Sequence, residues 1–169
     1  MKPVYHYDRL PLGTGILGIG PLPGRAGDLP GDLARIKDFA PALVISMTGT
    51  DEMAAHGAAD LPQALQHAGI DWAHFPVTDF GLPDPETAQG WQAVADKALA
   101  VCAAGGRVFV HCKAGRGRSG MVAMRLMVQL GEAPGPALAR LRAARPGAVE
   151  TEAQQDWAQQ DWTGTSPDG

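Results

Sequence analysis

The chain has 169 residues, of which 45 % are hydrophobic, and its 18 acidic and 14 basic residues give a formal net charge of −4. This length suits one domain with a hydrophobic core that needs neither disulfide nor metal support. The acidic balance argues against general nucleic-acid binding. No apolar run approaches a membrane span, and no polybasic run would hold the chain on an anionic membrane, so we expect no stable membrane association.

Two cysteines are present, Cys102 and Cys112, which is too few for a disulfide framework. Neither they nor the five histidines have the spacing of metal ligands. The sequence therefore predicts a cytoplasmic protein without metal or organic cofactor. We expect a single domain over residues 1–162 and a flexible tail over 163–169, and the sequence carries no signal for an oligomeric state.

The first half of the chain alternates short apolar runs with helical patterns, and each run is bounded by glycine or proline. This alternation predicts strands at 16–19, 43–47 and 72–77 and helices at 32–39 and 61–68.

Three glycines near the start, Gly13, Gly15 and Gly18, match the dinucleotide-binding fingerprint as text. That fingerprint must follow a strand and open a helix. Residues 19–24 contain two prolines and cannot begin a helix. We therefore interpret 13–18 as a glycine-rich turn and strand.

The second half begins with a helix expected over 86–103, which Asp84 can cap and Pro85 can start. A strand is expected at 107–111, then a strongly apolar and therefore buried helix at 117–130. Two further helices are expected at 136–145 and 150–160. Strands alternating with helices predict an α/β domain, with a mostly parallel central sheet of about four or five strands and helices on both faces.

The segment between the fourth strand and the buried helix is rich in glycine, and we call residues 111–120 the cysteine loop. Its glycines let the backbone curl so that successive N–H groups point into one concavity and bind an anion. The following helix adds unpaired N–H groups and the positive end of its dipole. This environment favours the thiolate form of Cys112, which could attack phosphorus.

Two further side chains of the loop fit the same chemistry. Arg118 can return across the loop and hold two phosphate oxygens with its planar guanidinium group. Ser119 can donate a hydrogen bond to the thiolate, and His111 is expected to fix the loop by hydrogen bonds. The residues expected to bind phosphate are Lys113, Ala114, Gly115, Arg116, Gly117, Arg118 and Ser119.

The pattern His-Cys-x5-Arg-Ser in this loop resembles the signature of the protein-tyrosine phosphatase superfamily. The resemblance implies the cysteine-phosphatase fold and a phosphocysteine intermediate, with Cys112 as nucleophile. The tyrosine-bearing recognition motif of the large tyrosine-specific enzymes is absent, which favours the small dual-specificity group. We therefore expect this chain to act on phosphorylated proteins or peptides, with phosphotyrosine first and phosphothreonine or phosphoserine second.

Phosphate-ester cleavage also needs a proton donor for the leaving oxygen, and Asp79 and Asp84 are the candidates. Asp84 has a structural explanation as a helix cap, whereas Asp79 ends a strand and precedes a glycine- and proline-containing loop. The stretch 74–84 is similar to the acid loop of dual-specificity phosphatases, particularly the cyclin-dependent-kinase-associated type. In that loop the aspartate two residues after the Pro-Val pair is the acid, which implies Asp79.

A third motif, residues 145–154, looks like the Gly-Ala/Leu-Ile-x-Thr-x-x-Gln segment of many such phosphatases. Its glutamine helps to place the hydrolytic water, which implies Gln154 here. Gln155 next to it and a solvated helix-surface role are the alternatives.

Two rival functions share these residues. Lys113 and Arg116 make the loop resemble that of phosphoinositide phosphatases of the phosphatase-and-tensin type. The other rival is a catalytically inactive phosphate-binding module, which would normally lack the cysteine, the arginine or the acid.

Overall fold

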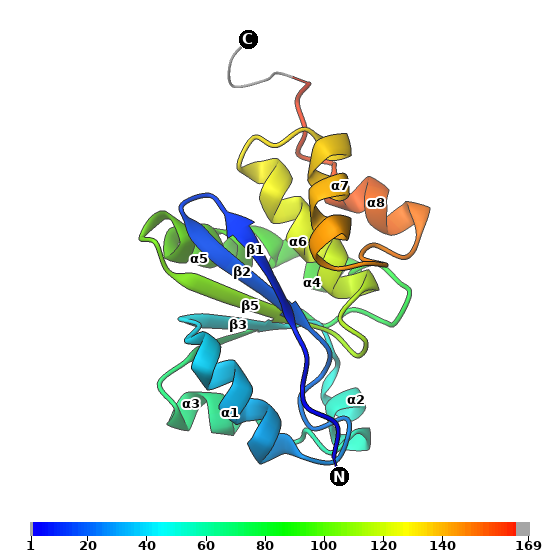
Figure 1. The fold of residues 1–169 in the computed structure, drawn as a ribbon. Coiled ribbons are helices and arrows are strands. Elements are labelled where there is room, and N and C mark those ends of the chain that lie inside the picture. Colours follow the sequence, from blue (N-terminus) through cyan, green and yellow to red (C-terminus); the bar gives the residue numbers. More distant parts are fainter. Residues whose placement is uncertain (1, 165–169) are drawn as a thin grey trace.

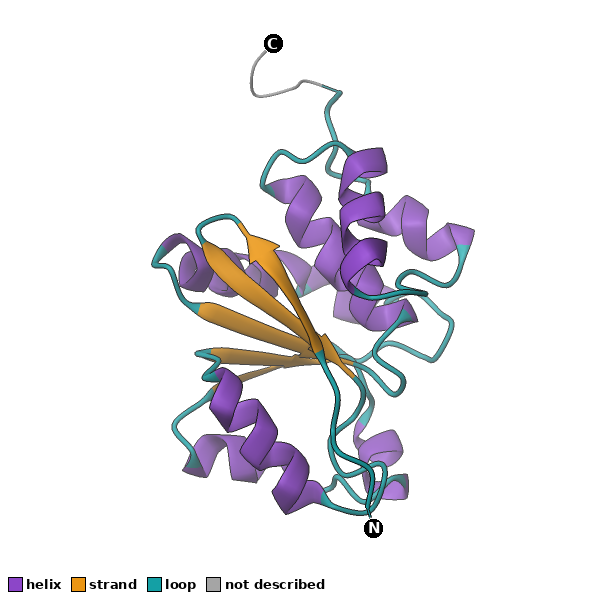
Figure 2. Cartoon of the chain, viewed as in Figure 1, coloured by secondary structure: helices purple, strands orange, loops and turns teal. Residues whose placement is uncertain are grey.

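The computed structural model describes residues 2–164. Over this part of the chain five strands form one sheet in the order β1-β2-β5-β3-β4, in which only β1 runs antiparallel to its neighbour. Figures 1 and 2 show this sheet at the centre of the molecule. The strands are β1 (Asp8–Leu12), β2 (Gly15–Gly20), β3 (Leu43–Ser46), β4 (Asp71–His74) and β5 (Arg107–His111).

Helices cover both faces of the sheet, as the sequence predicted (Figure 1). One face carries α1 (Leu29–Phe39), α2 (Thr50–Ala55) and α3 (Leu61–His67). The other carries α5 (Trp91–Ala103), α6 (Gly117–Gln129), α7 (Pro134–Ala144) and α8 (Glu152–Ala158), and α4 (Pro85–Gln89) precedes α5.

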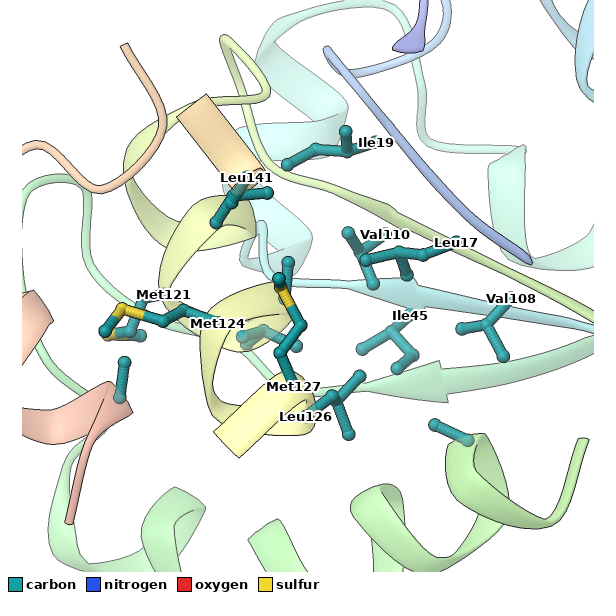
Figure 3. Packing of buried hydrophobic residues seen from close by; sticks show 14 of the residues in the cluster. Leu17, Ile19, Ile45, Val108, Val110, Met121, Met124, Leu126, Met127 and Leu141 are labelled. Atoms are coloured by element: carbon teal, nitrogen blue, oxygen red, sulfur yellow. The ribbon is translucent and has the colours of Figure 1, made fainter. Parts of the chain in front are cut away.

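The core divides into two layers because successive strand residues point to opposite faces. In β5, Val108 and Val110 pack toward α6, whereas Phe109 packs toward α1. Figure 3 shows Met127 of α6 pointing toward Leu17 and Val110 of the sheet. The all-round apolar sequence of α6 is explained by this position, since its residues are buried by the sheet and by α7 and α8.

Three features differ from the sequence prediction. The strand β1 was missed, because its charged residues and Pro11 are unlike a buried strand but are tolerated at a sheet edge. The helix α2 was also missed, since six mostly polar residues carry no readable period. The helix expected over 86–103 is broken at Gly90, which ends α4 and caps α5.

Residues 13–18 form the hairpin turn and the start of β2, so the interpretation of the glycine pattern is confirmed. No helix within residues 2–164 has both the length and the apolar character needed to cross a bilayer. The expected tail lies outside the described residues from position 165 onward.

The carboxyl ends of β2, β3, β4 and β5 meet at one edge of the sheet, and the segments that follow them lie close together (Figure 1). In open parallel sheets this edge is where ligands bind. The cysteine loop follows β5 and therefore lies at this edge.

Candidate active site

The cysteine loop joins β5 to α6, and its curl is held from outside by hydrogen bonds to its carbonyl oxygens. Arg145 donates to the oxygens of Gly115 and Ala114, at 2.9 and 3.1 Å. The carbonyl of Lys113 accepts from the Leu22 amide and from the Arg25 side chain, both at 3.1 Å. These bonds turn three successive carbonyl groups away from the inside of the loop.

The amide N–H groups of residues 114–116 are the other halves of those three peptide units. Because the C=O and N–H of one planar peptide point in opposite directions, these amides face the inside of the loop. None of them donates a hydrogen bond to any acceptor among residues 2–164. Gly115 makes this curl possible: its φ is +74°, and a Cβ there would collide with the backbone of Gly20.

Cys112 lies at the base of this concavity, directly after β5, with 2 % of its surface exposed. The start of α6 at Gly117 adds further N–H groups on the same side. The arrangement is an anion-binding cradle with a sulfur atom at its floor.

Arg118 is almost completely buried, with 1 % of its surface exposed. Both of its terminal nitrogens donate to the Glu52 carboxylate at 2.8 Å, and Nη1 also donates to the carbonyl of Val77 at 2.8 Å. Its Nη2 lies 3.4 Å from an Asp79 oxygen. Burial alone would lower the pKa of Arg118, but hydrogen bonds to Glu52 and the negative charges around it raise that pKa above its ordinary value.

Two buried polar atoms beside the cradle have no hydrogen-bond partner among residues 2–164, namely Nε of Arg118 and Oγ of Ser119. Leaving such groups unsatisfied costs roughly 1–3 kcal/mol each. Both are donors, and both belong to the first turn of α6. A bound oxyanion could accept hydrogen bonds from both atoms.

His111 is fully buried and takes part in a chain of hydrogen bonds. The Trp72 indole donates to Ser46 Oγ at 2.8 Å, and Ser46 in turn contacts His111 Nε2. On the other side, His111 Nδ1 lies 3.3 Å from the Cys112 carbonyl. All of these hydrogen bonds can form at once when His111 is neutral and carries its proton on Nδ1. Burial is the main reason that the pKa of His111 falls to about 4.

The burial of neutral His111 predicts that the protein loses stability in mild acid. The folded-state pKa of His111 is about 4, below the ordinary value of 6.5, so the unfolded chain takes up the proton first. The contribution of neutral His111 to the free energy of unfolding is complete above about pH 6.5 and is lost as the pH falls toward 4. We expect the wild type to lose about 2 kcal/mol more than His111→Asn in unfolding free energy between about pH 7 and pH 5, measured by urea titration. Parallel losses in the two proteins would contradict this assignment.

The structure separates the two candidate acids. Asp84 accepts the Thr87 amide at 2.8 Å and caps α4, as predicted, and this bond lowers the pKa of Asp84. Asp79 lies in the loop after β4 and faces Arg118, with 42 % of its side chain exposed. Asp79 is therefore the aspartate that the fold brings to the cysteine loop.

Gln154 is fully buried at the start of α8, so the solvated-surface alternative is wrong. Its Oε1 accepts from the amides of Glu150 and Thr151, at 3.0 and 3.3 Å, in a capping box. Its Nε2 makes only a long contact, 3.4 Å, to the carbonyl of Gly81 in the loop that carries Asp79. From the first turn of α8, Gln154 thus lies near both the loop that carries Asp79 and Gly117 of the cysteine loop.

The remaining predicted residues, Lys113 and Arg116, lie on the outer rim of the loop. Arg116 is exposed, and neither side chain forms an ion pair among residues 2–164. Two residues of the site were missed from the sequence, Glu52 and Arg145. A buried arginine needs a carboxylate partner, but the sequence does not show which of the 18 acidic residues supplies it.

Glu52 holds the Arg118 guanidinium in one orientation, so Glu52→Gln tests its role as a positioning residue. The neutral amide cannot form the bidentate pair. We expect about a tenfold loss in kcat/KM for an aryl phosphate and about 2 kcal/mol in unfolding free energy. Asp51→Asn, a neighbouring exposed site in α2, is the matched control. Wild-type activity in Glu52→Gln would refute this role.

The fold and the cysteine loop together are those of the protein-tyrosine phosphatase class. The chain belongs to the family described as "Polymorphic toxin system, DSP-PTPase phosphatase", whose model matches residues 44–132, more than half of its length. The matched residues include Asp79 and the whole cysteine loop.

The chain is also similar in sequence or in structure to individual known proteins. Cyclin-dependent kinase inhibitor 3 of Rattus norvegicus is 32 % identical over 110 residues, which cover 63 % of this chain and 50 % of that protein. A kinase associated phosphatase whose catalytic-site cysteine is replaced by serine has a similar structure, with a TM-score of 0.81, 23 % identity and 94 % of both chains covered. PTPMT1 in complex with PI(5)P has a TM-score of 0.69, 21 % identity and 93 % of both chains covered. The chain spans half or less of the curated relatives that it matches.

Proposed function

We propose that this chain is an active phosphatase that hydrolyses phosphate monoesters through a phosphocysteine intermediate on Cys112. The observation that carries this proposal is the cradle: carbonyls drawn outward, amides facing inward, and a cysteine at the floor. The unsatisfied Arg118 Nε and Ser119 Oγ support it, because both lie where phosphate oxygens and the thiolate would accept their hydrogen bonds.

In the first step, the Cys112 thiolate attacks phosphorus in line with the leaving oxygen. The loop amides and Arg118 stabilise the negative charge on the three equatorial oxygens. Asp79 donates its proton to the leaving oxygen as the P–O bond breaks. The products are an alcohol or phenol, an ionised Asp79 and a phosphocysteine.

In the second step, a water attacks the phosphocysteine and gives its proton to Asp79. The P–S bond breaks, inorganic phosphate leaves, and the sulfur departs as a thiolate that accepts a hydrogen bond from Ser119. Gln154 can hold this water with its Nε2 group, whose contact to the Gly81 carbonyl is long at 3.4 Å.

The substrates that we propose are phosphorylated proteins or peptides, phosphotyrosine first and phosphothreonine or phosphoserine second. The family and the relatives named above support a dual-specificity phosphatase. The second candidate is a phosphoinositide phosphatase with the same mechanism, favoured by the unpaired charges of Lys113 and Arg116. We also propose that residues 1–162 form one phosphatase domain. The protein is proposed to work in the cytoplasm, a reducing compartment in which the free thiols of Cys102 and Cys112 would persist.

A substrate panel tests this function. We expect turnover of an aryl phosphate and of a phosphotyrosine peptide, slower turnover of the matched phosphothreonine peptide, and the lowest kcat/KM for a soluble phosphoinositide. A folded protein that turns over none of these would refute the proposed activity. A clear preference for the phosphoinositide would replace the first substrate class with the second.

A further inference from the structure

The carboxylate of Glu150 lies against the cysteine loop. Gly117, which begins α6, has no side chain, and a Cβ added there would collide with Oε1 of Glu150. The Oε1 atom of Gln154 would lie 3.2 Å from the same Cβ. The missing side chain of Gly117 therefore leaves the space through which Glu150 reaches the loop, one residue before Arg118.

The backbone that carries Glu150 is strained. Val149 has a φ of +64°, in the left-handed region, where a β-branched residue is a genuine outlier. Hydrogen bonds hold it there: its amide donates to the Arg116 carbonyl at 3.1 Å, and its carbonyl accepts from the Arg142 side chain at 2.9 Å. Backbone strain of this kind clusters at functional sites, and here the strained residue immediately precedes Glu150.

The Glu150 carboxylate has no partner in the described part of the protein. Its side chain is exposed, and within residues 2–164 it forms no ion pair and accepts no hydrogen bond. Asp79, in contrast, lies 3.4 Å from Nη2 of Arg118. Because the Glu150 oxygens are accessible and unpaired, their lone pairs are free to accept a hydrogen bond from water.

Gln154 brings the segments of the two carboxylates together. It belongs to α8, which packs beside α6 (Figure 1). Its Oε1 accepts from the Glu150 amide at 3.0 Å, and its Nε2 lies 3.4 Å from the carbonyl of Gly81, two residues after Asp79. A water held by Nε2 of Gln154 would therefore have carboxylates from two segments near it.

We propose that Glu150 is a second general base of the phosphatase, which accepts a proton from the water that hydrolyses the phosphocysteine. The water oxygen forms the new bond to phosphorus, and the P–S bond breaks with its electron pair going to the Cys112 sulfur. One water proton passes to the Glu150 carboxylate, which then loses it to solvent. Asp79, ionised after the first step, is the other acceptor. The proposal rests on the function proposed above and adds a residue to its second step.

The test isolates the second step. An aryl phosphate with a good leaving group makes the first step fast, so stopped-flow mixing gives a burst of the phenol and then a steady release at the rate of the second step. We measure that steady rate for each variant. Because either carboxylate can accept the proton, Asp79→Asn and Glu150→Gln should each retain about half of the wild-type rate.

The double variant Asp79→Asn/Glu150→Gln should lose roughly 10²-fold or more, because glutamine can hold a water but cannot take its proton. Asp79→Asn/Glu150→Asp keeps a carboxylate and should regain about tenfold of that loss. The matched control, Asp79→Asn/Glu152→Gln, removes an equal charge from an exposed site in the first turn of α8 and should match Asp79→Asn. A second step as fast in Asp79→Asn/Glu150→Gln as in Asp79→Asn would overturn the proposal. So would a 10²-fold loss of the second step in Asp79→Asn alone.

The burst separates this inference from the proposed activity. A burst close to one phenol per enzyme, with a second step that does not respond to changes at Glu150, would retain the phosphatase and refute the second base. Absence of both burst and turnover in the folded wild type would refute the proposed function, and the role of Glu150 would fall with it. Urea titration should give Glu150→Gln the unfolding free energy of the wild type, because the Glu150 carboxylate has no partner to lose.

Discussion

Replacing Cys112 with serine is expected to lower kcat for an aryl phosphate by roughly 10⁴-fold or more, the scale seen when a covalent nucleophile is removed. A serine hydroxyl stays protonated near neutral pH and is a much weaker nucleophile than a thiolate. The cradle of amides does not depend on the sulfur, so affinity for inorganic phosphate should remain close to that of the wild type. Steady-state kinetics and phosphate inhibition measure the two effects separately.

Cys102→Ser is the control for this experiment. Cys102 is buried in α5, and burial raises the pKa of its thiol, so it is suited to packing rather than to nucleophilic attack. This variant should keep nearly full activity. Substantial turnover by Cys112→Ser, or loss of activity in Cys102→Ser with the fold intact, would refute the assignment of the nucleophile.

The second large effect is expected at Asp79. Asp79→Asn removes the group that gives a proton to the leaving oxygen, and it should slow hydrolysis by roughly 10²–10⁴-fold. The penalty should shrink for aryl phosphates with good leaving groups, because a stable phenolate needs little protonation. A series of phenols of decreasing pKa, compared between wild type and variant, measures this dependence.

Asp84→Asn is the matched control in the same loop region. Asparagine caps a helix about as well as aspartate, so both the stability and the rate should stay near those of the wild type. If Asp84→Asn were the impaired enzyme and Asp79→Asn the normal one, the roles given to these two residues would be exchanged.

Much of the site was predictable because it follows local rules. A strand, a glycine-rich turn and a buried helix are adjacent in the sequence between residues 107 and 130, and the loop chemistry can be read within them. The cap at Asp84 is likewise a contact between near neighbours. The central strands were found from their short apolar runs, and the α/β architecture followed from their alternation with helices.

The parts that were missed depend on contacts between distant segments. Glu52 meets Arg118 across 66 positions of the chain, from a short helix with no apolar period. Arg145 reaches the loop from 30 positions away, and β1 joins the sheet as an edge strand with charged residues. Sequence patterns report which face of an element is apolar, but not which polar side chains the fold brings together.

The most direct test of the central claim is to trap the covalent intermediate. The wild type is mixed with saturating aryl phosphate, quenched in acid during steady-state turnover, digested and mapped by mass spectrometry. Our account predicts one phosphoryl group on the peptide that contains Cys112, attached through sulfur, and none on the peptide that contains Cys102. Turnover at a normal rate with the phosphoryl group on another residue would contradict it.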